Sequence, residues 1–303
     1  MVTSGSTFHG KTNAWIADDS GNGINESTVT KKEKEDSTKW TFPQFRYIIN
    51  TRCSAIHHEY LFVVPSAMAK FYARQRIRQT WAARYNASVV FFLGLNNTEG
   101  IANQVRAESD KYKDIVVANY VDSYRNLTLK TMSIIQWLND ESCENVKFVT
   151  KTDDDLYVNL PLLKTLLSKL EATRDDKADY IVGRVKRNAT PVRDKNSQFY
   201  KKWGVSEDEY SGRVYPDYCL GSGYLFPYRT VKKLYDVSRT TKPLFLEDVF
   251  LTGIVAEKAG IERINGNCFI FTAFYAYVCE LIERACCAVL TQSKQIDLTK
   301  CPV

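Results

Sequence analysis

Four apolar runs of strand length, separated by helical patterns, constrain the fold more than any other feature of the sequence. The runs lie at residues 60–64, 89–93, 114–118 and 146–150. Apolar residues with helical spacing fill the intervals, at about residues 67–85, 98–112 and 127–138. Strands that alternate with helices form parallel sheets, because each helix carries the chain back to the starting edge for the next strand. The pattern therefore predicts an α/β fold with a mostly parallel sheet.

Composition and charge narrow the class of protein. The chain has 303 residues, of which 44% are hydrophobic, so it is long enough to bury a full core. Its net charge of +6 comes from 41 basic and 35 acidic residues spread along the whole length. A nucleic-acid-binding protein usually concentrates positive charge into a stripe, so we expect an ordinary solvated surface and no nucleic acid partner. No apolar run is long enough to span a membrane, so membrane attachment is expected only through an anchor not present in this sequence.

The first 57 residues differ in character from the rest. Up to about Lys39 they are rich in Ser, Thr, Gly, Asn and Lys and carry almost no apolar periodicity, which is typical of a disordered tail or stem. A transition segment follows. We therefore predict a tail and transition segment over residues 1–57 and one large domain over residues 58–303.

Cysteines and glycosylation triplets bear on the compartment. Of the eight cysteines none forms a Cys-x-x-Cys pair, and the three histidines all lie at or before His58, so a structural zinc site is not expected. In an oxidising lumen several cysteines could pair, in a connectivity that the sequence does not determine; alternatively some are small buried apolar residues. Asn-x-Ser/Thr triplets, which favour a secretory route, begin at Asn25, Asn86, Asn96, Asn126 and Asn188.

Three consecutive carboxylates, Asp153, Asp154 and Asp155, directly follow the fourth apolar run. Ligands of open α/β sheets bind beyond the carboxyl ends of the strands, which is where these residues are expected. Like charges at such short range oppose ionisation, and a hard divalent cation such as Mg²⁺ or Mn²⁺ relieves the repulsion. The alternative interpretation is a solvated loop or a helix cap, because Pro161 and a helical pattern follow closely.

Two further charged groups are candidates for a site. Glu247 and Asp248 open a helical pattern, where they either stabilise the helix dipole or supply a general base for a hydroxyl nucleophile. Arg74 and Arg78 share one face of an earlier helical pattern, where they either bind phosphate or form surface salt bridges. The polar and aromatic residues 186–216 predict a long loop region that shapes a pocket.

Eight short motifs occur in order between about residues 60 and 262. They are Arg74-x-x-Ile77-Arg78-x-Thr80-Trp81, Phe91-Phe-Leu-Gly94, Glu108-x-x-x-Tyr112-x-Asp114-Ile115, Asp122-x-Tyr124-x-Asn126-Leu-Thr-Leu-Lys-Thr131, Lys151-x-Asp153-Asp-Asp155, Lys202-Trp203-x-Val-Ser206, Tyr215-Pro-x-Tyr-Cys-x-Gly-x-Gly-Tyr224 and Glu247-Asp-Val249. Each motif alone is weak. Together they resemble the β-1,3-galactosyltransferase family, which includes β-1,3-N-acetylglucosaminyltransferases.

This resemblance implies a glycosyltransferase A (GT-A) fold, in which a nucleotide-binding α/β half joins an acceptor-binding half within a catalytic domain at residues 58–303. It implies an inverting enzyme that uses Mn²⁺ or another divalent cation. Such an enzyme moves a hexose from a UDP-sugar to the 3-hydroxyl of an acceptor sugar on a glycoprotein or glycolipid. Residues 202–206 and 215–219 look more like the galactosyl branch, which favours UDP-galactose. Location in the Golgi lumen, through an N-terminal membrane anchor, is implied as well.

The resemblance also implies roles for individual residues. Asp248 becomes the catalytic base, and Asp155, with Asp153, becomes the metal ligand. Expected donor contacts are Arg74, Arg78, Asp153 and Asp154, and expected acceptor contacts are Trp203, Tyr218 and Glu247.

One departure from the family leaves an alternative open. Family members tend to carry a histidine near the C-terminus in a Val-x-x-His-Gln-like context, and here Thr291 stands at the comparable position. A relative without that histidine could be a catalytically impaired protein that binds glycans or acts like a chaperone. A metal-dependent phosphohydrolase would share the carboxylates but not the other motifs.

Overall fold

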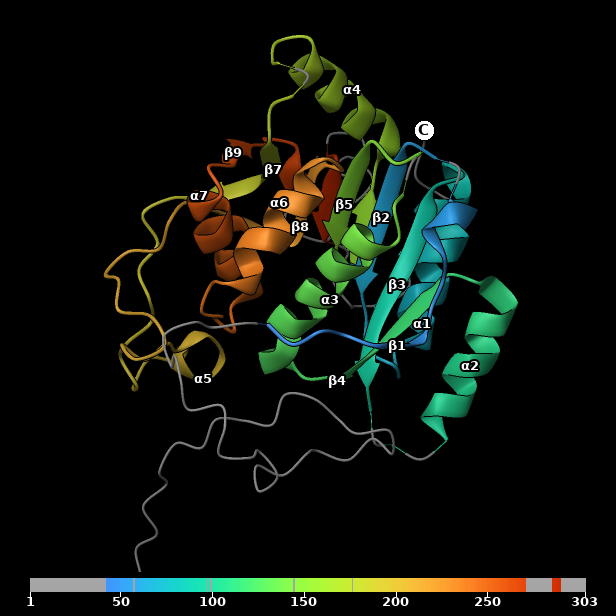
Figure 1. The fold of residues 1–303 in the computed structure, drawn as a ribbon, viewed down its shortest axis with the longest axis horizontal. Coiled ribbons are helices and arrows are strands. Elements are labelled where there is room, and N and C mark those ends of the chain that lie inside the picture. The colour runs from blue at the N-terminus through green and yellow to red at the C-terminus, as the bar shows by residue number, and fades with distance from the viewer. Residues whose placement is uncertain are drawn as a thin grey trace, which may run out of the picture.

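The computed structural model describes residues 42–270, apart from residues 57, 97, 99, 144 and 176, and residues 285–289 (Figure 1). The tail predicted up to Lys39 and the position of Thr291 lie outside this part of the chain. Its central element is an eight-stranded sheet.

Four parallel strands form the first half of the sheet, as the apolar runs predicted. They are β2 (Tyr60–Pro65), β3 (Ser88–Leu95), β4 (Ile115–Val121) and β5 (Phe148–Thr152), in the spatial order β4-β3-β2-β5. The helices between them are α1 (Phe71–Ile77), which continues as the π-helical turn η3 (Arg78–Ala82), α2 (Ile101–Tyr112), and α3 (Leu127–Asp140), which follows the 3-10 turn η4 (Tyr124–Asn126). The α/β fold is therefore confirmed.

Strands of mixed direction extend the sheet on both sides. Strand β8 (Tyr218–Pro227) runs antiparallel to β5 and to β7 (Tyr180–Lys186), and β9 (Glu262–Asn265) runs parallel to β7. At the opposite edge, β1 (Tyr47–Ile49) pairs antiparallel with β4. A separate three-stranded sheet has the order β10 (Phe269–Ile270), β11 (Cys287–Val289) and β6 (Leu156–Val158). The mixed sheet joins the parallel half to a second half of different topology, which is consistent with the predicted GT-A type.

The remaining helices are η2 (Cys53–Ala55), α4 (Leu160–Glu171), α5 (Tyr200–Trp203), α6 (Thr230–Arg239), the π-helix η5 (Val249–Val255) and α7 (Ala256–Lys258). Of these, η2 lies between β1 and β2, and the others follow β6.

Alternate side chains of the parallel strands enter two different cores. In β2, Leu61 and Val63 pack into the core that includes α3 and α6, and Phe62 and Val64 pack into the core on the other face. Figure 1 shows α3 and α6 crossing one face of the sheet. Because both faces are buried, the parallel strands read as continuous apolar runs and not as alternating patterns.

The transition segment belongs to the folded unit from Phe42 onward. Phe42 and Phe45 are buried in the same core as α3, and the chain then forms β1. A disulfide joins Cys53 to Cys143, which follows α3. The extent of the tail that precedes this segment stays a prediction.

Part of the expected cysteine pairing is confirmed. Besides Cys53–Cys143, a disulfide joins Cys268 to Cys286, and Cys219 and Cys287 are buried free thiols. Disulfides of this kind form and persist in oxidising compartments. Within the described ranges, no helix is both long and apolar enough to cross a membrane.

Candidate active site

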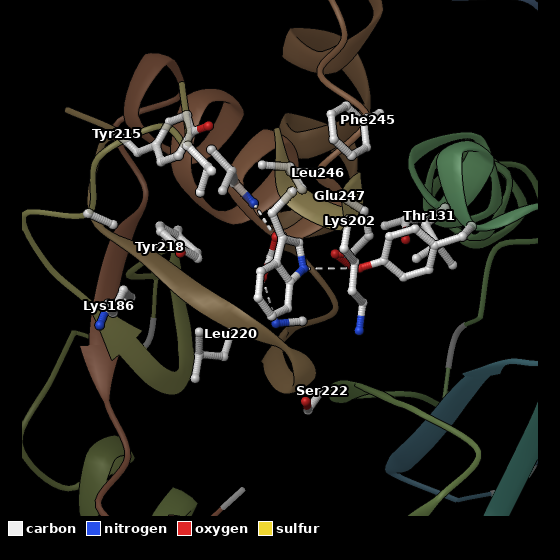
Figure 2. A pocket seen from close by; sticks show the side chains of 18 of the residues that line it. Thr131, Lys186, Lys202, Tyr215, Tyr218, Leu220, Ser222, Phe245, Leu246 and Glu247 are labelled. Carbon is white, nitrogen blue, oxygen red and sulfur yellow. Dashed lines mark hydrogen bonds between the residues drawn. The ribbon is translucent and has the colours of Figure 1, made fainter. Parts of the chain in front are cut away.

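A cavity of about 840 Å³ opens at the carboxyl ends of the parallel strands. Pro65 at the end of β2 and Asp153, directly after β5, line it. The opposite walls come from β8, the segment before η5, the start of α3 and the loop region between β7 and β8. Figure 2 shows Glu247, Lys202 and Tyr218 around this cavity, on segments far apart in the sequence. The cavity therefore lies where ligands of open α/β sheets bind.

Asp153 is the member of the acidic triplet that lines the cavity. Its backbone N–H donates to the carbonyl of Ser222 on β8 (3.0 Å), which fixes the turn after β5. Its carboxylate accepts a hydrogen bond from the Lys151 ammonium (2.7 Å) and is 42% exposed. This oxygen-rich, partly exposed position suits a residue that contacts a bound ligand.

Asp154 turns away from the cavity and into the protein. It is 4% exposed, and its carboxylate accepts from the Ser66 hydroxyl (2.9 Å) and the Lys70 ammonium (2.7 Å). These contacts tie the acidic turn to the loop that follows β2. Both of its carboxylate oxygens already accept hydrogen bonds from that loop. The predicted contact of Asp154 with the donor stays a prediction.

Asp155 lies beside two like charges, which Lys70 only partly offsets. Burial raises its pKa, and the neighbouring carboxylates of Asp153 and Asp154 raise it further. In the part of the chain that the structure describes, no three His, Cys, Asp or Glu side chains converge on one metal position. The described carboxylates could therefore supply only one or two protein ligands to a divalent cation, and the predicted metal site stays a prediction.

Asp248 caps the N-terminus of η5 and faces the cavity. One carboxylate oxygen accepts from the backbone N–H of Val249 (2.9 Å), and the other accepts from the backbone N–H of Gly221 on β8 (3.0 Å). Burial raises the pKa of the carboxyl, although the two N–H donors oppose this rise. Asp248 is therefore both fixed in orientation and a stronger proton acceptor than a solvated aspartate.

Glu247 is buried at the cavity wall, with one oxygen left free. Its Oε1 accepts from the Tyr224 hydroxyl (3.0 Å) and lies 3.5 Å from the Lys151 ammonium. Its Oε2 is buried and has no hydrogen-bond partner within the described residues. Burial raises the pKa of Glu247 to about 7. A buried oxygen without a partner is costly, so this atom is a candidate contact for a bound hydroxyl.

An aromatic wall faces the carboxylates. Trp203, on α5, donates from its indole N–H to the Tyr124 hydroxyl (3.2 Å) and stacks on Phe199 with ring centroids 5.5 Å apart. Tyr218, at the start of β8, is half-buried, and burial raises its pKa to about 12. Trp203 and Tyr218 both line the cavity, so the structure brings these two predicted acceptor residues together with Glu247.

The loop region predicted at residues 186–216 shapes this wall, and the arginine that holds it was not foreseen. Within it α5 is the one helix that the structure describes. The Arg193 guanidinium donates to the backbone carbonyls of Val205 (2.5 Å), Tyr210 and Gly212 (3.3 Å). A lone arginine in a polar loop carries no sequence signal for such a role.

Arg74 and Arg78 lie in an ion-paired cluster and do not line the cavity. Arg74 is 0% exposed and donates to Glu108 (2.6 Å) and to the backbone carbonyls of Ala67 and Met68 (2.7 and 3.0 Å). Arg78 pairs with Glu108 and Asp114, both at 2.7 Å. The salt-bridge alternative thus describes their observed contacts, although the Arg74–Glu108 pair is buried and the Arg78–Asp114 pair is partly buried. Their direct contact with the donor stays a prediction.

Comparisons with known proteins agree with the motifs. The profile of the galactosyltransferase family matches residues 72–267. Human lactosylceramide 1,3-N-acetyl-beta-D-glucosaminyltransferase is 34% identical over 233 residues, which cover 72% of this chain and 60% of that enzyme. Human beta-1,3-galactosyltransferase 1 is 33% identical over 232 residues, which cover 74% of this chain and 68% of that enzyme.

Among solved structures, a glycosyltransferase involved in the glycosylation of the major capsid of PBCV-1 superposes with a TM-score of 0.39 at 11% identity. The superposition covers 78% of this chain and 94% of that chain. The family profile and the two human relatives, which match most of the chain, decide its affiliation. The chain belongs to the galactosyltransferase family and is a hexosyltransferase of the β-1,3-galactosyltransferase-like type.

Proposed function

We propose that this chain is an inverting, metal-dependent glycosyltransferase that moves a hexose, galactose by preference, from a UDP-sugar to the 3-hydroxyl of an acceptor sugar. The observation that carries the proposal is the convergence of Asp153 and Asp248 on one cavity. One carboxylate follows a parallel strand, and the other caps a helix 95 residues later, yet both line the same space. Family membership supports the nucleotide-sugar donor and the glycan acceptor.

Asp248 is the proposed general base. A sugar hydroxyl is a poor nucleophile, so its proton must leave as the new bond forms. In a single displacement, the acceptor oxygen attacks the anomeric carbon of the donor and passes its proton to the Asp248 carboxylate. The bond from the anomeric carbon to the phosphate oxygen breaks, and its electron pair leaves with UDP. Attack from the side opposite to the leaving group inverts the configuration.

Asp155, with Asp153, is the proposed metal-binding pair. When bound, Mn²⁺ or a similar cation would supply Lewis-acid stabilisation of the negative charge on the departing diphosphate. The raised pKa of Asp155 supports this assignment, because a cation would remove the repulsion from its neighbours. Asp154, held by Ser66 and Lys70, keeps the turn in place.

The acceptor is proposed to lie between the carboxylates and the aromatic wall. The free Oε2 of Glu247 is available to accept a hydrogen bond from a sugar hydroxyl. Trp203 and Tyr218 offer apolar ring faces against which a pyranose can pack, and the Tyr218 hydroxyl can orient it. A glycan of a glycoprotein or glycolipid fits this description. The two disulfides support a lumenal location such as the Golgi, which remains part of the proposal.

The test is UDP release from UDP-galactose and from UDP-N-acetylglucosamine, each with a panel of sugar acceptors, with Mn²⁺ and with chelator. Acceptor-dependent release that chelator abolishes is expected, and UDP-galactose should give the faster rate. Linkage and anomeric configuration of the product are read by NMR. Mn²⁺-dependent UDP binding without any release would overturn the proposal in favour of a catalytically impaired, glycan-binding relative.

Asp248→Asn provides the sharpest check of the base. The amide keeps the size of the side chain and removes its basicity, so transfer should be abolished while UDP binding remains. Loss of UDP binding in a folded variant would place Asp248 in the donor site instead. Circular dichroism verifies the fold.

A further inference from the structure

Lys151 is a buried cation in the wall of the cavity. It is the fourth residue of β5 and 5% exposed. The side chain is an ammonium group with three protons to donate, and the carboxylates of Asp153 and Glu247 lie beside it.

The ammonium contacts three separate segments of the site. It donates to Asp153 in the acidic turn (2.7 Å) and to the backbone carbonyl of Gly221 on β8, and it lies 3.5 Å from Glu247. Gly221 in turn donates its own N–H to Asp248 (3.0 Å). One side chain thus connects the acidic turn, through a single residue of β8, to the proposed base.

Gly221 packs closely against Asp248. A Cβ atom at this position would lie 3.3 Å from the Asp248 Cβ and 3.4 Å from its Oδ2. The backbone of β8 therefore packs directly against Asp248, and a displacement of the Gly221 carbonyl moves the N–H that orients the base.

We propose that Lys151 is a positioning residue that sets the placement of the base Asp248 relative to the Asp153 turn. The proposal rests on the proposed function. Transfer in a single displacement needs the base and the leaving group on opposite sides of the anomeric carbon, and misplacement of reacting groups by about 1 Å can reduce a rate about 100-fold. A buried ion pair is by itself weak support for stability, so the retention of a charge here is better explained by geometry.

Lys151→Met is the test, because methionine keeps the length of the side chain and removes its charge. In the full chain, kcat should fall about 100-fold while UDP affinity with Mn²⁺, measured by calorimetry, stays close to wild type. UDP affinity that falls in parallel with kcat would show that Lys151 acts on the donor site, directly or through Asp153, and would overturn the positioning role. An unchanged kcat would show that the lysine only fills space.

The control for lost stability is Gln136→Leu. Gln136 is buried on α3, bonds the backbone of Phe45 through both amide atoms, and does not line the cavity. This variant should unfold at a lower urea concentration but keep the wild-type kcat. If it loses as much activity as Lys151→Met, general destabilisation explains both and the proposal fails.

Removal of the lysine alone leaves two carboxylates without a counter-charge and can prevent folding. The Lys151→Met/Glu247→Gln double variant removes one of them, and it is compared with Glu247→Gln alone. A further fall of about 100-fold in kcat between these two is expected, whereas equal rates would overturn the proposal.

A crystal structure of Lys151→Met separates this inference from the proposed function. Displacement of Asp248 and Gly221 relative to Asp153 supports the positioning role whether or not transfer is detected. An unchanged arrangement overturns it. Absence of transfer in the wild-type protein would overturn the proposed function but not the structural link between Lys151 and Asp248.

Discussion

Substitution of Arg74, the buried arginine on α1, distinguishes most clearly between a structural role and a donor-binding role. Arg74 and Glu108 are 0% and 8% exposed, and their ion pair is 2.6 Å long. Arg74→Met would remove this pair and also the donors to the carbonyls of Ala67 and Met68. Because Arg78 still pairs with Glu108, the carboxylate would keep one partner. Breaking a buried pair from one side costs about 3 to 5 kcal/mol, and we expect a loss of unfolding free energy in this range.

Urea denaturation measures the loss, and Arg84→Met serves as the matched control. Arg84 is an exposed arginine just beyond η3, so its substitution should change the unfolding free energy by less than about 0.5 kcal/mol. UDP affinity, measured on folded protein, should be retained in both variants. The reasoning is refuted if Arg74→Met keeps wild-type stability and loses UDP binding, since the arginine would then contact the donor as the family resemblance implied.

Three further predictions concern the metal motif, the buried glutamate and a disulfide. Asp155→Ala should abolish the dependence of UDP binding on Mn²⁺, and an unchanged Mn²⁺ response would refute the metal assignment. Burial raises the pKa of Glu247 from 4.5 to about 7, so between these pH values the folded protein retains a proton that the unfolded chain releases. The unfolding free energy should therefore fall as pH rises through this window, and it should fall less in Glu247→Gln. Urea denaturation at several pH values measures it, and an equal pH dependence in the two proteins would contradict the assignment. The Cys53→Ser/Cys143→Ser double variant should lose about 2 to 5 kcal/mol of unfolding free energy, and an unchanged urea midpoint would contradict a structural role for the bond.

The parallel half of the sheet was predictable because both of its faces are buried. Runs such as residues 60–64 are apolar at every position, and short runs of this kind separated by helical patterns have few alternatives. A glycine directly after a helical pattern is a stop signal, and Gly260, which follows α7, has the positive φ of 62° that such a stop requires. The π-helical form of η5 was not predicted.

Sequence rules for helix capping failed where the side chain bonds a group outside its own helix. Asparagine is a preferred capping residue, and Asn126 occupies the N-cap position of α3. Its side chain, however, makes no capping bond and donates to the backbone carbonyl of Val121 (2.8 Å). The turn η4 places Asn126 beside the end of β4, and the helical pattern alone contains no information on that turn.

The site was predictable in its residue types and much less in its contacts. The position of the acidic triplet at the end of a strand followed from the alternation of strands and helices. The different contacts of its three carboxylates could not be predicted in this way, because the partners of Asp154 lie 84 and 88 residues away in sequence. The role of Lys151 likewise depends on β8 lying beside β5, an antiparallel pairing that no local pattern encodes.

Strand β11 has a consequence for biosynthesis. It pairs with β6, which begins one residue after Asp155, although about 130 residues separate the two strands in sequence. A ribosome releases the N-terminal half first, so β6 must wait for residues 287–289 before it gains its neighbour. The strand that directly follows the acidic turn therefore gains this neighbour among the last steps of folding. Chains truncated before β11 should still contain all the strands of the parallel half, whereas β6 should lack its partner β11.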